Sequence, residues 1–275
     1  MKIVTEYENI LAKQDVYKTS SDVKKKSMIP TELRFFPALL RIVIFANKLT
    51  KKNIYNRYNW VNSSKMIMDG LEKVGVKIEI DGMHNFCSFD GPVVFIGNHM
   101  STLETLVLPR IINPIKPVVF VTKEELNTAP LFGPINSSRY PIVVSRKNAR
   151  EDLMQVMNQG AERLKDGRSI ILFPQKTRSP IFDKNNFNTL GIKLAKRNNV
   201  PIIPIALLTD AWGNGKIMKE FGKIDISKKV CFSFGKPMEI SGNGSEQHNQ
   251  VVEFITSHLK KWGREELILE EKNGN

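Results

Sequence analysis

The sequence predicts an α/β protein with a mixed, largely parallel sheet flanked by helices. Short apolar runs, typical of buried strands, alternate along the chain with segments whose apolar residues recur at helical spacing. The 275 residues are enough to bury a large core without covalent crosslinks, and the only cysteines are Cys87 and Cys231. The low cysteine count excludes a disulfide scaffold and a cysteine-built zinc site.

The predicted strands begin at residue 76. The segment 76–80 alternates apolar with charged residues and stops at Asp81-Gly82, a pair that favours a turn. Further strands are expected at the later apolar runs 92–96, 116–122, 141–145, 169–173, 200–208 and 230–234. Because helical patterns separate several of these runs, parallel pairing with helical connections is expected for much of the sheet.

Three later segments show helical spacing. Residues 148–165 place a stripe of apolar side chains on one face, and Gly167 follows as a candidate C-cap. Residues 189–197 predict a short helix, and 245–262 predict the clearest one, with Ser245 as a candidate N-cap. We therefore expect one α/β domain over residues 76–265 and a tail over 266–275, of which residues 270–275 are polar.

The chain is strongly basic, with a formal net charge of +13, and residues 1–60 alone hold 12 Lys and Arg against 5 Asp and Glu. Such a surplus indicates an anionic partner, which can be a nucleic acid, a phospholipid surface or a phosphorylated substrate. The sequence contains no aromatic-rich RNA-binding strand and no recognisable DNA-reading helix. A nucleic acid partner is therefore not expected.

The basic N-terminal part, residues 1–75, contains the one long apolar segment, 33–45. Two arginines and Pro37 interrupt the segment, which is too short to span a bilayer and lies too far into the chain for a signal peptide. It either lies in a membrane interface or packs as a buried helix on the domain. The flanking lysines favour the interface; they are Lys24, Lys25, Lys26, Lys48, Lys51 and Lys52.

A candidate general base follows the predicted strand 92–96. His99 lies at a strand-to-helix junction, and the carboxyl ends of strands in open α/β sheets are where ligands bind. Glu104 lies five residues further, so it can orient His99 only if His99 precedes the helix and Glu104 lies in its first turn. A capping box is the alternative, because Ser101 and Glu104 form an S-x-x-E pattern. The two roles are compatible.

Cationic and hydroxyl side chains follow three other predicted strands. Lys123 and Arg146 each come directly after a strand, and Gln175, Thr177 and Arg178 follow the strand 169–173. Each stretch alone is typical of an ordinary polar turn. Together with His99 they predict a site that deprotonates a hydroxyl group beside a bound phosphate.

Taken in order, these stretches resemble the glycerolipid acyltransferase family, that of the 1-acyl-glycerol-3-phosphate acyltransferases. Residues 98–104, Asn-His-Met-Ser-Thr-Leu-Glu, match the family's N-H-x-S-x-x-D/E motif, and 173–179 resemble its F-P-E-G-T-R-S block. Residues 142–146 resemble the block that ends in a phosphate-binding arginine. Residues 123–133 and 200–205 resemble two further stretches of the family, so the resemblance covers roughly residues 93–208.

The sequence departs from the family pattern at four positions. Gln175 and Lys176 stand where the family has Glu and Gly, in the block that helps to bind the acyl acceptor. Ser145 replaces the usual Asp, and Pro141 lies where Gly is common. Gln175 keeps the shape of Glu but not its charge, and Lys176 adds a cation. An acceptor other than lysophosphatidate is therefore a second interpretation.

The resemblance implies a glycerol-3-phosphate acyltransferase-like fold and an O-acyltransferase of phospholipid biosynthesis. His99, oriented by Glu104, is then the base that activates an acceptor hydroxyl, that of 1-acyl-glycerol-3-phosphate above all. Acyl-CoA or acyl-carrier protein is the acyl donor, and no cofactor or metal is implied. The residues expected to bind the acceptor are Lys123, Arg146, Gln175, Thr177 and Arg178.

The resemblance also implies association with a phospholipid membrane, peripheral or monotopic, at its cytoplasmic face. Two other classes of function stay open. One is a non-catalytic membrane-surface protein that uses the basic surplus. The other is a hydrolase with Ser101 as nucleophile and His99 as base, which the capping-box pattern at Ser101 disfavours.

Overall fold

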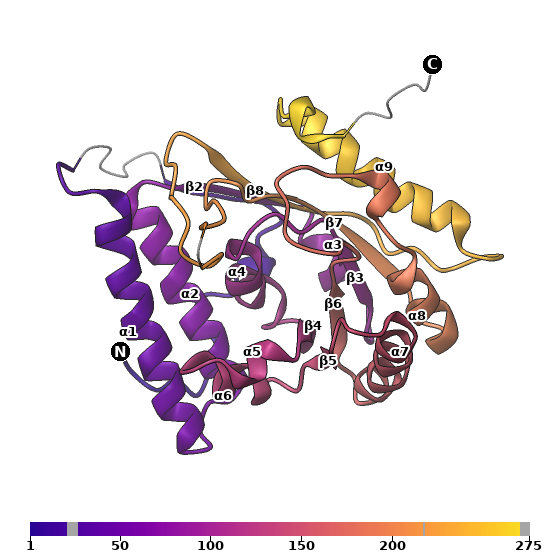
Figure 1. Cartoon of the computed structure of the whole chain (residues 1–275), viewed down its shortest axis with the longest axis horizontal. Coiled ribbons are helices and arrows are strands. Elements are labelled where there is room, and N and C mark those ends of the chain that lie inside the picture. The colour runs from indigo at the N-terminus through magenta and orange to yellow at the C-terminus, as the bar shows by residue number, and fades with distance from the viewer. Residues whose placement is uncertain (21–26, 217, 270–275) are drawn as a thin grey trace.

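The structure, a computed structural model, describes residues 1–20, 27–216 and 218–269. Its centre is an eight-stranded sheet in the order β1-β2-β8-β7-β3-β6-β4-β5 (Figure 1). The strands are β1 Tyr17–Lys18, β2 Lys77–Asp81, β3 Val94–Gly97, β4 Val118–Lys123, β5 Ile142–Val144, β6 Ser169–Leu172, β7 Ile202–Leu208 and β8 Lys229–Phe234. Neighbours are parallel except for β1 with β2 and β7 with β8. The predicted mixed, largely parallel sheet is confirmed; β1 was not foreseen.

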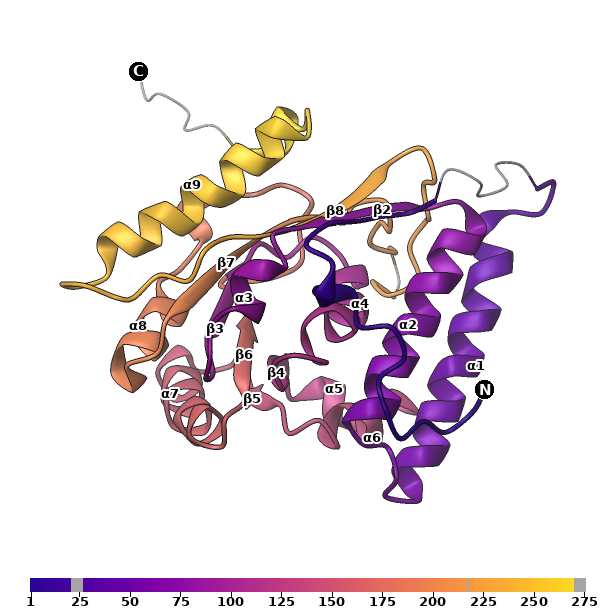
Figure 2. The same ribbon diagram turned by 180° about the vertical axis from the view of Figure 1, so that it is seen from behind.

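Helices cover both faces of the sheet (Figures 1 and 2). They are α1 Thr31–Lys51, α2 Arg57–Val74, α3 His84–Cys87, α4 Leu103–Ile112, α5 Glu125–Thr128, α6 Phe132–Ser137, α7 Ala149–Lys165, α8 Leu190–Asn198 and α9 Ser245–Lys261. The helices predicted at 148–165, 189–197 and 245–262 are therefore confirmed to within two residues. The N-cap prediction is wrong, because Gly244 caps α9 in a left-handed conformation that a residue without Cβ adopts readily.

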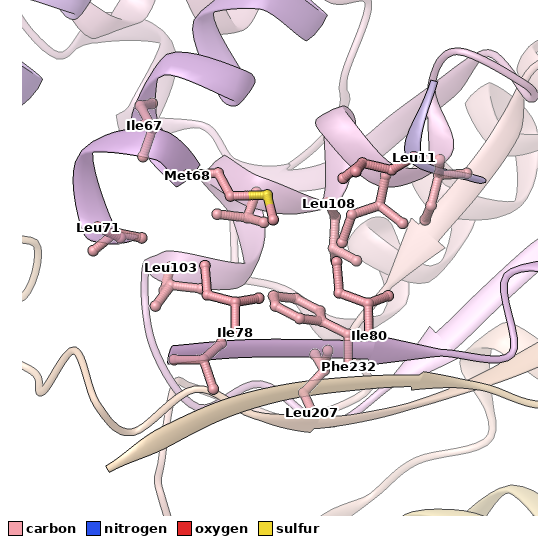
Figure 3. Close-up of a cluster of buried hydrophobic side chains, with 14 of the residues drawn as sticks. Leu11, Ile67, Met68, Leu71, Ile78, Ile80, Leu103, Leu108, Leu207 and Phe232 are labelled. Atoms are coloured by element: carbon pink, nitrogen blue, oxygen red, sulfur yellow. The ribbon is translucent and has the colours of Figure 1, made fainter. Parts of the chain in front are cut away.

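The side chains of the central strands alternate between two apolar layers. Phe95 and Ile171 face a cluster that α1, α2 and α4 complete, and Figure 3 shows part of this cluster around Met68 and Phe232. Val94, Ile96 and their neighbours in β6 face a second cluster that α7, α8 and α9 complete. Burial on both faces explains why these strands are apolar along their whole length.

The apolar segment 33–45 lies in α1, which packs along α2. One face of α1 is buried in the core through Phe35, Leu39 and Ile42. The opposite face leaves Leu33 and Leu40 exposed, at 67% and 48% of their surface. The helix therefore has a packed face and an apolar free face. Its predicted N-terminal flank, Lys24 to Lys26, lies outside the described residues.

The chain after α9 returns to the domain. Ile268 pairs with Phe182 in a parallel bridge, and Leu267 is buried. Leu267 and Ile268 of the predicted tail are thus packed on the domain, and residues 270–275 lie outside the described residues. Among the described residues no helix is both long enough and apolar enough to cross a membrane.

Candidate active site

The candidate site lies where four parallel strands, β3, β6, β4 and β5, end at one edge of the sheet. Gly97 ends β3 close to β7. A Cβ atom on residue 97 would lie only 3.0 Å from the carbonyl oxygen of Ile205, so the two strands approach closely here. The next residue, Asn98, is buried and exchanges two hydrogen bonds with the backbone of Leu207, at 2.8 and 2.9 Å. These contacts fix the backbone from which the His99 side chain leaves.

His99 and Glu104 are in direct contact. His99 precedes α4 and Glu104 lies in its first turn, and Nδ1 of His99 lies 2.9 Å from Oε1 of Glu104. The His99 side chain keeps 15% of its surface exposed, whereas Glu104 is fully buried. Among the described residues no group is placed to hydrogen bond to Nε2 of His99. The imidazole therefore has one nitrogen held by a carboxylate and the other available to a ligand.

The Glu104 carboxylate is surrounded by donors. Oε1 also accepts the backbone N–H groups of Met100 and Ser101, at 2.7 and 2.9 Å. Oε2 accepts the hydroxyls of Thr209 and Ser101, at 2.6 and 2.9 Å. Burial by itself raises the pKa of Glu104, but the hydrogen bonds from His99, Thr209 and Ser101 outweigh it and hold the pKa below its ordinary value. The carboxylate is therefore ionised at neutral pH.

The capping role and the contact with His99 occur together. Glu104 accepts the N–H of Ser101, and the Ser101 hydroxyl oxygen accepts the N–H of Leu103 at 3.1 Å. Ser101 is 1% exposed, and its hydroxyl is also hydrogen-bonded to Glu104 and Thr209. This hydroxyl is thus enclosed and engaged in the start of α4, which does not suit an attacking nucleophile.

Three residues that follow β6, Phe173, Gln175 and Ser179, hold His99 from the other side. The ring of His99 stacks on Phe173, with centroids 4.5 Å apart and planes 7° apart. The backbone N–H of His99 donates to Oε1 of Gln175 at 2.6 Å, and its carbonyl accepts the N–H of Ser179 at 2.9 Å. A glutamate at position 175 would accept the same bond. Gln175 therefore fixes the His99 backbone without carrying a charge.

Lys123, Arg146 and Arg178 form a cationic cluster at the same edge. The guanidinium of Arg146 donates to the carbonyl of Lys176, which ties the end of β5 to the loop after β6. Burial lowers the pKa of Lys123, and the positive charges of Arg146 and Arg178 lower it further. Burial likewise lowers the pKa of Arg146, with a contribution from Arg178. Such mutual repulsion is relieved by an anion bound between the side chains.

A loop between β7 and β8 closes onto this cluster. Arg178 donates to the hydroxyl of Thr102 and forms an ion pair with Glu220, with Nη2 2.6 Å from Oε1. Lys219 donates to the hydroxyl of Thr177 at 3.2 Å. Lys219 and Glu220, like Thr209 and Phe173, were not among the predicted site residues. Phe173 opens the block 173–179, whereas Thr209, Lys219 and Glu220 adjoin no recognisable motif, and only the fold brings these three to this edge.

The predicted site residues are thus assembled at one sheet edge. His99 contacts Glu104 and Gln175 directly, and Arg178 contacts Thr102 in the same motif. Lys123, Arg146 and Thr177 lie in the adjoining cationic part. In the part of the chain that the structure describes, no three His, Cys, Asp or Glu side chains are grouped to hold a metal ion.

Comparison with known proteins shows which family the central part of the chain resembles. A family model described as Acyltransferase matches residues 77–208. A 1-acyl-sn-glycerol-3-phosphate acyltransferase of Pseudomonas aeruginosa is 33% identical over 132 residues, which are 48% of this chain and 49% of that protein. A chloroplastic protein of the same description from Arabidopsis thaliana is 30% identical over 142 residues, 52% of this chain and 38% of that protein. The matched region spans about half or less of these relatives.

The fold has a solved counterpart. The crystal structure of the 1-acyl-sn-glycerophosphate acyltransferase PlsC from Thermotoga maritima superposes with a TM-score of 0.60 at 18% identity, over 85% of this chain and 95% of that one. The family resemblance predicted from the motifs is confirmed: residues 77–208 are a domain of the acyltransferase family, similar to those of 1-acyl-sn-glycerol-3-phosphate acyltransferases.

Proposed function

We propose that this protein transfers an acyl chain from acyl-CoA or acyl-carrier protein to the free hydroxyl of a lysophospholipid, with 1-acyl-glycerol-3-phosphate as the acceptor. The observation that carries the proposal is the pair of His99 and Glu104, 2.9 Å apart beside a cluster of cations. A base next to a phosphate site suits an acceptor that bears a hydroxyl and a phosphate in one molecule. The names of the relatives support this class of acceptor.

In this proposal His99 acts as the general base through Nε2. It takes the proton of the acceptor hydroxyl as the oxygen attacks the thioester carbonyl, and it returns the proton to the departing thiolate. Glu104 fixes the imidazole in one tautomer and stabilises the imidazolium that forms, because its carboxylate is ionised and buried. No acyl-enzyme is needed, since acceptor and donor react directly once they are aligned.

The acceptor phosphate binds to Arg146 and Arg178, with Thr177 and Lys123 nearby. An arginine fork suits phosphate because its N–H groups match two phosphate oxygens at once. To reach Arg178 the phosphate displaces the carboxylate of Glu220. The loop that carries Glu220 is therefore proposed to move when the acceptor binds.

The replacement of the family's Glu by Gln175 is compatible with this acceptor. Gln175 accepts a hydrogen bond from the His99 backbone, a contact that needs an oxygen and no charge. The side chain of Lys176 is exposed, and the residue contributes its carbonyl to Arg146. A more anionic acceptor than lysophosphatidate remains the second candidate, because Lys176 adds a positive charge at the rim.

We also propose that the exposed face of α1 docks on the cytoplasmic surface of a phospholipid membrane. Leu33 and Leu40 are seven residues apart and so share one face of the helix, with Arg41 and Lys48 exposed nearby. Because the other face of α1 belongs to the core, deletion of the helix would uncover the core. The test is instead the double substitution Leu33→Glu and Leu40→Glu.

Co-sedimentation with vesicles that contain anionic phospholipid measures this docking. The double variant should leave the vesicles largely unbound, because two charges enter the apolar face. Met154→Glu is the matched control, since Met154 is an exposed apolar side chain on α7, away from α1. Equal binding of the double variant and the wild type would contradict docking through α1.

Acceptor-dependent release of CoA tests the reaction itself. Purified protein is incubated with acyl-CoA or acyl-carrier protein and a panel of lysolipids, and both the released CoA or free carrier protein and the acylated products are measured. Release only with an acceptor, together with the diacyl product, supports the transferase. Release without acceptor indicates a hydrolase, and no release with either donor indicates a non-catalytic membrane-surface protein.

A further inference from the structure

A second basic site lies at the opposite end of the sheet. A cleft of about 650 Å³ is lined by the segments that precede β4, β5 and β6, and by the turn between α1 and α2. The active site is at the carboxyl ends of these strands, so the cleft lies at their amino ends. A cleft of this volume is in the range that holds small-molecule ligands.

Three arginines line the cleft: Arg57, Arg139 and Arg168. Among the described residues no carboxylate lies within ion-pairing distance of any of them. Burial lowers the pKa of Arg57 and of Arg139, and the positive charge of Arg168 lowers both further. Three guanidinium groups that repel one another and lack carboxylate partners form a site that an anion stabilises.

Two of these arginines are held in place by the backbone. Arg57 donates to the carbonyl of Asn113, and Arg139 donates to the carbonyl of Tyr55 while stacking on the rings of Tyr55 and Trp60. These contacts fix both guanidinium groups before any ligand arrives. A fixed group costs less conformational entropy when it binds.

Arg168 is held differently. No hydrogen bond from its side chain to a described residue is seen, and its guanidinium lies over the ring of Tyr140 at 4.6 Å from the centroid. Tyr140 is 55% exposed, so it also offers aromatic surface at the cleft. The donors of Arg168 are thus available to a ligand.

A buried amide in the cleft wall also lacks a partner. Asn113 is 1% exposed, and its Oδ1 accepts the N–H of Val118 at 3.2 Å, but its Nδ2 has no hydrogen-bond partner among the described residues. Buried donors are rarely left unpaired. Among the described residues that line the cleft, the one acidic residue is Asp166, which leaves a surplus of positive charge.

From these observations we infer that the cleft is a second binding site, for a soluble phosphate ester of about the size of a nucleoside monophosphate. The arginines recognise the phosphate, and the aromatic rings of Trp60 and Tyr140 give a planar group a surface to stack on. The inference does not depend on the acyl-transfer proposal, because no residue of the cleft takes part in that site.

Calorimetric titration of the full chain tests the inference. The probes are adenosine monophosphate, inorganic phosphate and, as the uncharged comparison, adenosine. The wild type should bind adenosine monophosphate with a dissociation constant below about 1 mM and bind adenosine far more weakly. Arg168→Gln should weaken that binding by about 10- to 100-fold.

Two control variants separate this site from others. Arg197→Gln removes one exposed charge at the end of α8, outside the cleft, and should not change binding. Arg178→Gln alters the active-site cluster and should also leave the cleft binding intact. Equal binding by Arg168→Gln and wild type, or loss of binding only in Arg178→Gln, would overturn the inference.

Tryptophan fluorescence gives a readout that needs no arginine variant. Trp60 lines the cleft, whereas Trp212 and Trp262 do not. Adenosine monophosphate should change the tryptophan fluorescence of the wild type and leave the fluorescence of the Trp60→Phe variant unchanged. Binding of anionic vesicles alone, with none of the soluble phosphates, would also contradict the inference, because the partner would then be a lipid surface.

Discussion

At the scale of single residues, the feature on which the site depends is the buried carboxylate of Glu104. It accepts hydrogen bonds from the His99 ring, from two backbone N–H groups and from two hydroxyls. These bonds compensate for the loss of water around a buried charge. One side chain thereby starts α4 and orients His99, so the helix and the proposed base are positioned by the same interaction.

The ion pair between Arg178 and Glu220 leads to the first prediction. Glu220→Gln should lower the KM for the acceptor by about two- to fivefold, because the phosphate then competes with a neutral group for Arg178. The value of kcat should stay near that of the wild type. Steady-state kinetics with varied acceptor measures both constants.

Glu239→Gln is the control for this prediction, since Glu239 is exposed and lies outside the site. A raised KM in Glu220→Gln would mean that Glu220 positions Arg178 for the phosphate instead of competing with it.

Site contacts between residues close together in the sequence could be predicted, and contacts between residues far apart in the sequence could not. His99 and Glu104 lie within one short motif, so their contact followed from a strand-to-helix junction. Thr209 bonds to Glu104, 105 residues away along the chain, and Glu220 in the same loop bonds to Arg178, 42 residues away. Only the pairing of β7 with β3 and β8 brings that loop there, and no local pattern encodes it.

At the scale of elements, α2 shows why one helix was not located from the sequence. Its buried face includes the polar residues Asn59, Ser63 and Ser64 among apolar ones. Ser64 donates to the carbonyl of Leu106 in α4, and the hydroxyl of Ser63 donates to the carbonyl of Asn59. Small polar residues let the helices approach, but they interrupt the apolar stripe by which a helix is recognised.

The packing of α1 gives the second prediction. Phe35 is 1% exposed and meets the ring of Trp212 edge to face, 5.1 Å between centroids. Phe35→Ala should lower the free energy of unfolding by about 3–5 kcal/mol, because it leaves a cavity between α1 and the loop after β7. Denaturant unfolding measures the change.

Leu33→Ala, on the exposed face of the same helix, is the matched control and should change stability by less than about 0.5 kcal/mol. Similar losses of unfolding free energy in both variants would show that the face of α1 that carries Phe35 does not stabilise its packing on the domain.

At the scale of the whole molecule, Asp210 joins parts that are far apart in the chain. It follows β7 and accepts hydrogen bonds from Arg264, beyond α9, and from Lys228, before β8. Burial raises the pKa of Asp210, but the bonds and charges of Arg264 and Lys228 outweigh it, so the pKa is lowered. A carboxylate with a lowered pKa stabilises the fold above its unfolded-state pKa and loses this effect as the pH falls.

Asp210→Asn tests this link. The variant should lose about 1.5–3 kcal/mol of unfolding free energy at neutral pH. The difference from the wild type should shrink as the pH falls below 3.8, the ordinary pKa of the group. Thermal unfolding at a series of pH values measures it. Asp90→Asn, an exposed position, is the control, and a difference independent of pH would contradict an ionic link.

Three groups of basic residues, part of the surplus behind the net charge of +13, are separate in the folded molecule. Lys123, Arg146 and Arg178 gather at the carboxyl ends of the strands, and Arg57, Arg139 and Arg168 line the cleft at the amino ends. Exposed charges on α1 border its apolar face. Composition predicted an anionic partner, but it could not assign separate anion sites, because the cleft arginines come from segments with no shared motif.

The central claim is that His99 is the base of an acyl transfer, and the turnover of His99→Ala tests it most directly. With acyl-CoA and 1-acyl-glycerol-3-phosphate, the variant should lose at least about 100-fold, and up to about 10,000-fold, in kcat. Its circular dichroism should match the wild type, because Glu104 keeps four other hydrogen-bond donors, while its melting temperature should fall slightly with the loss of the His99 bond. Turnover near that of the wild type in the folded variant would contradict the mechanism.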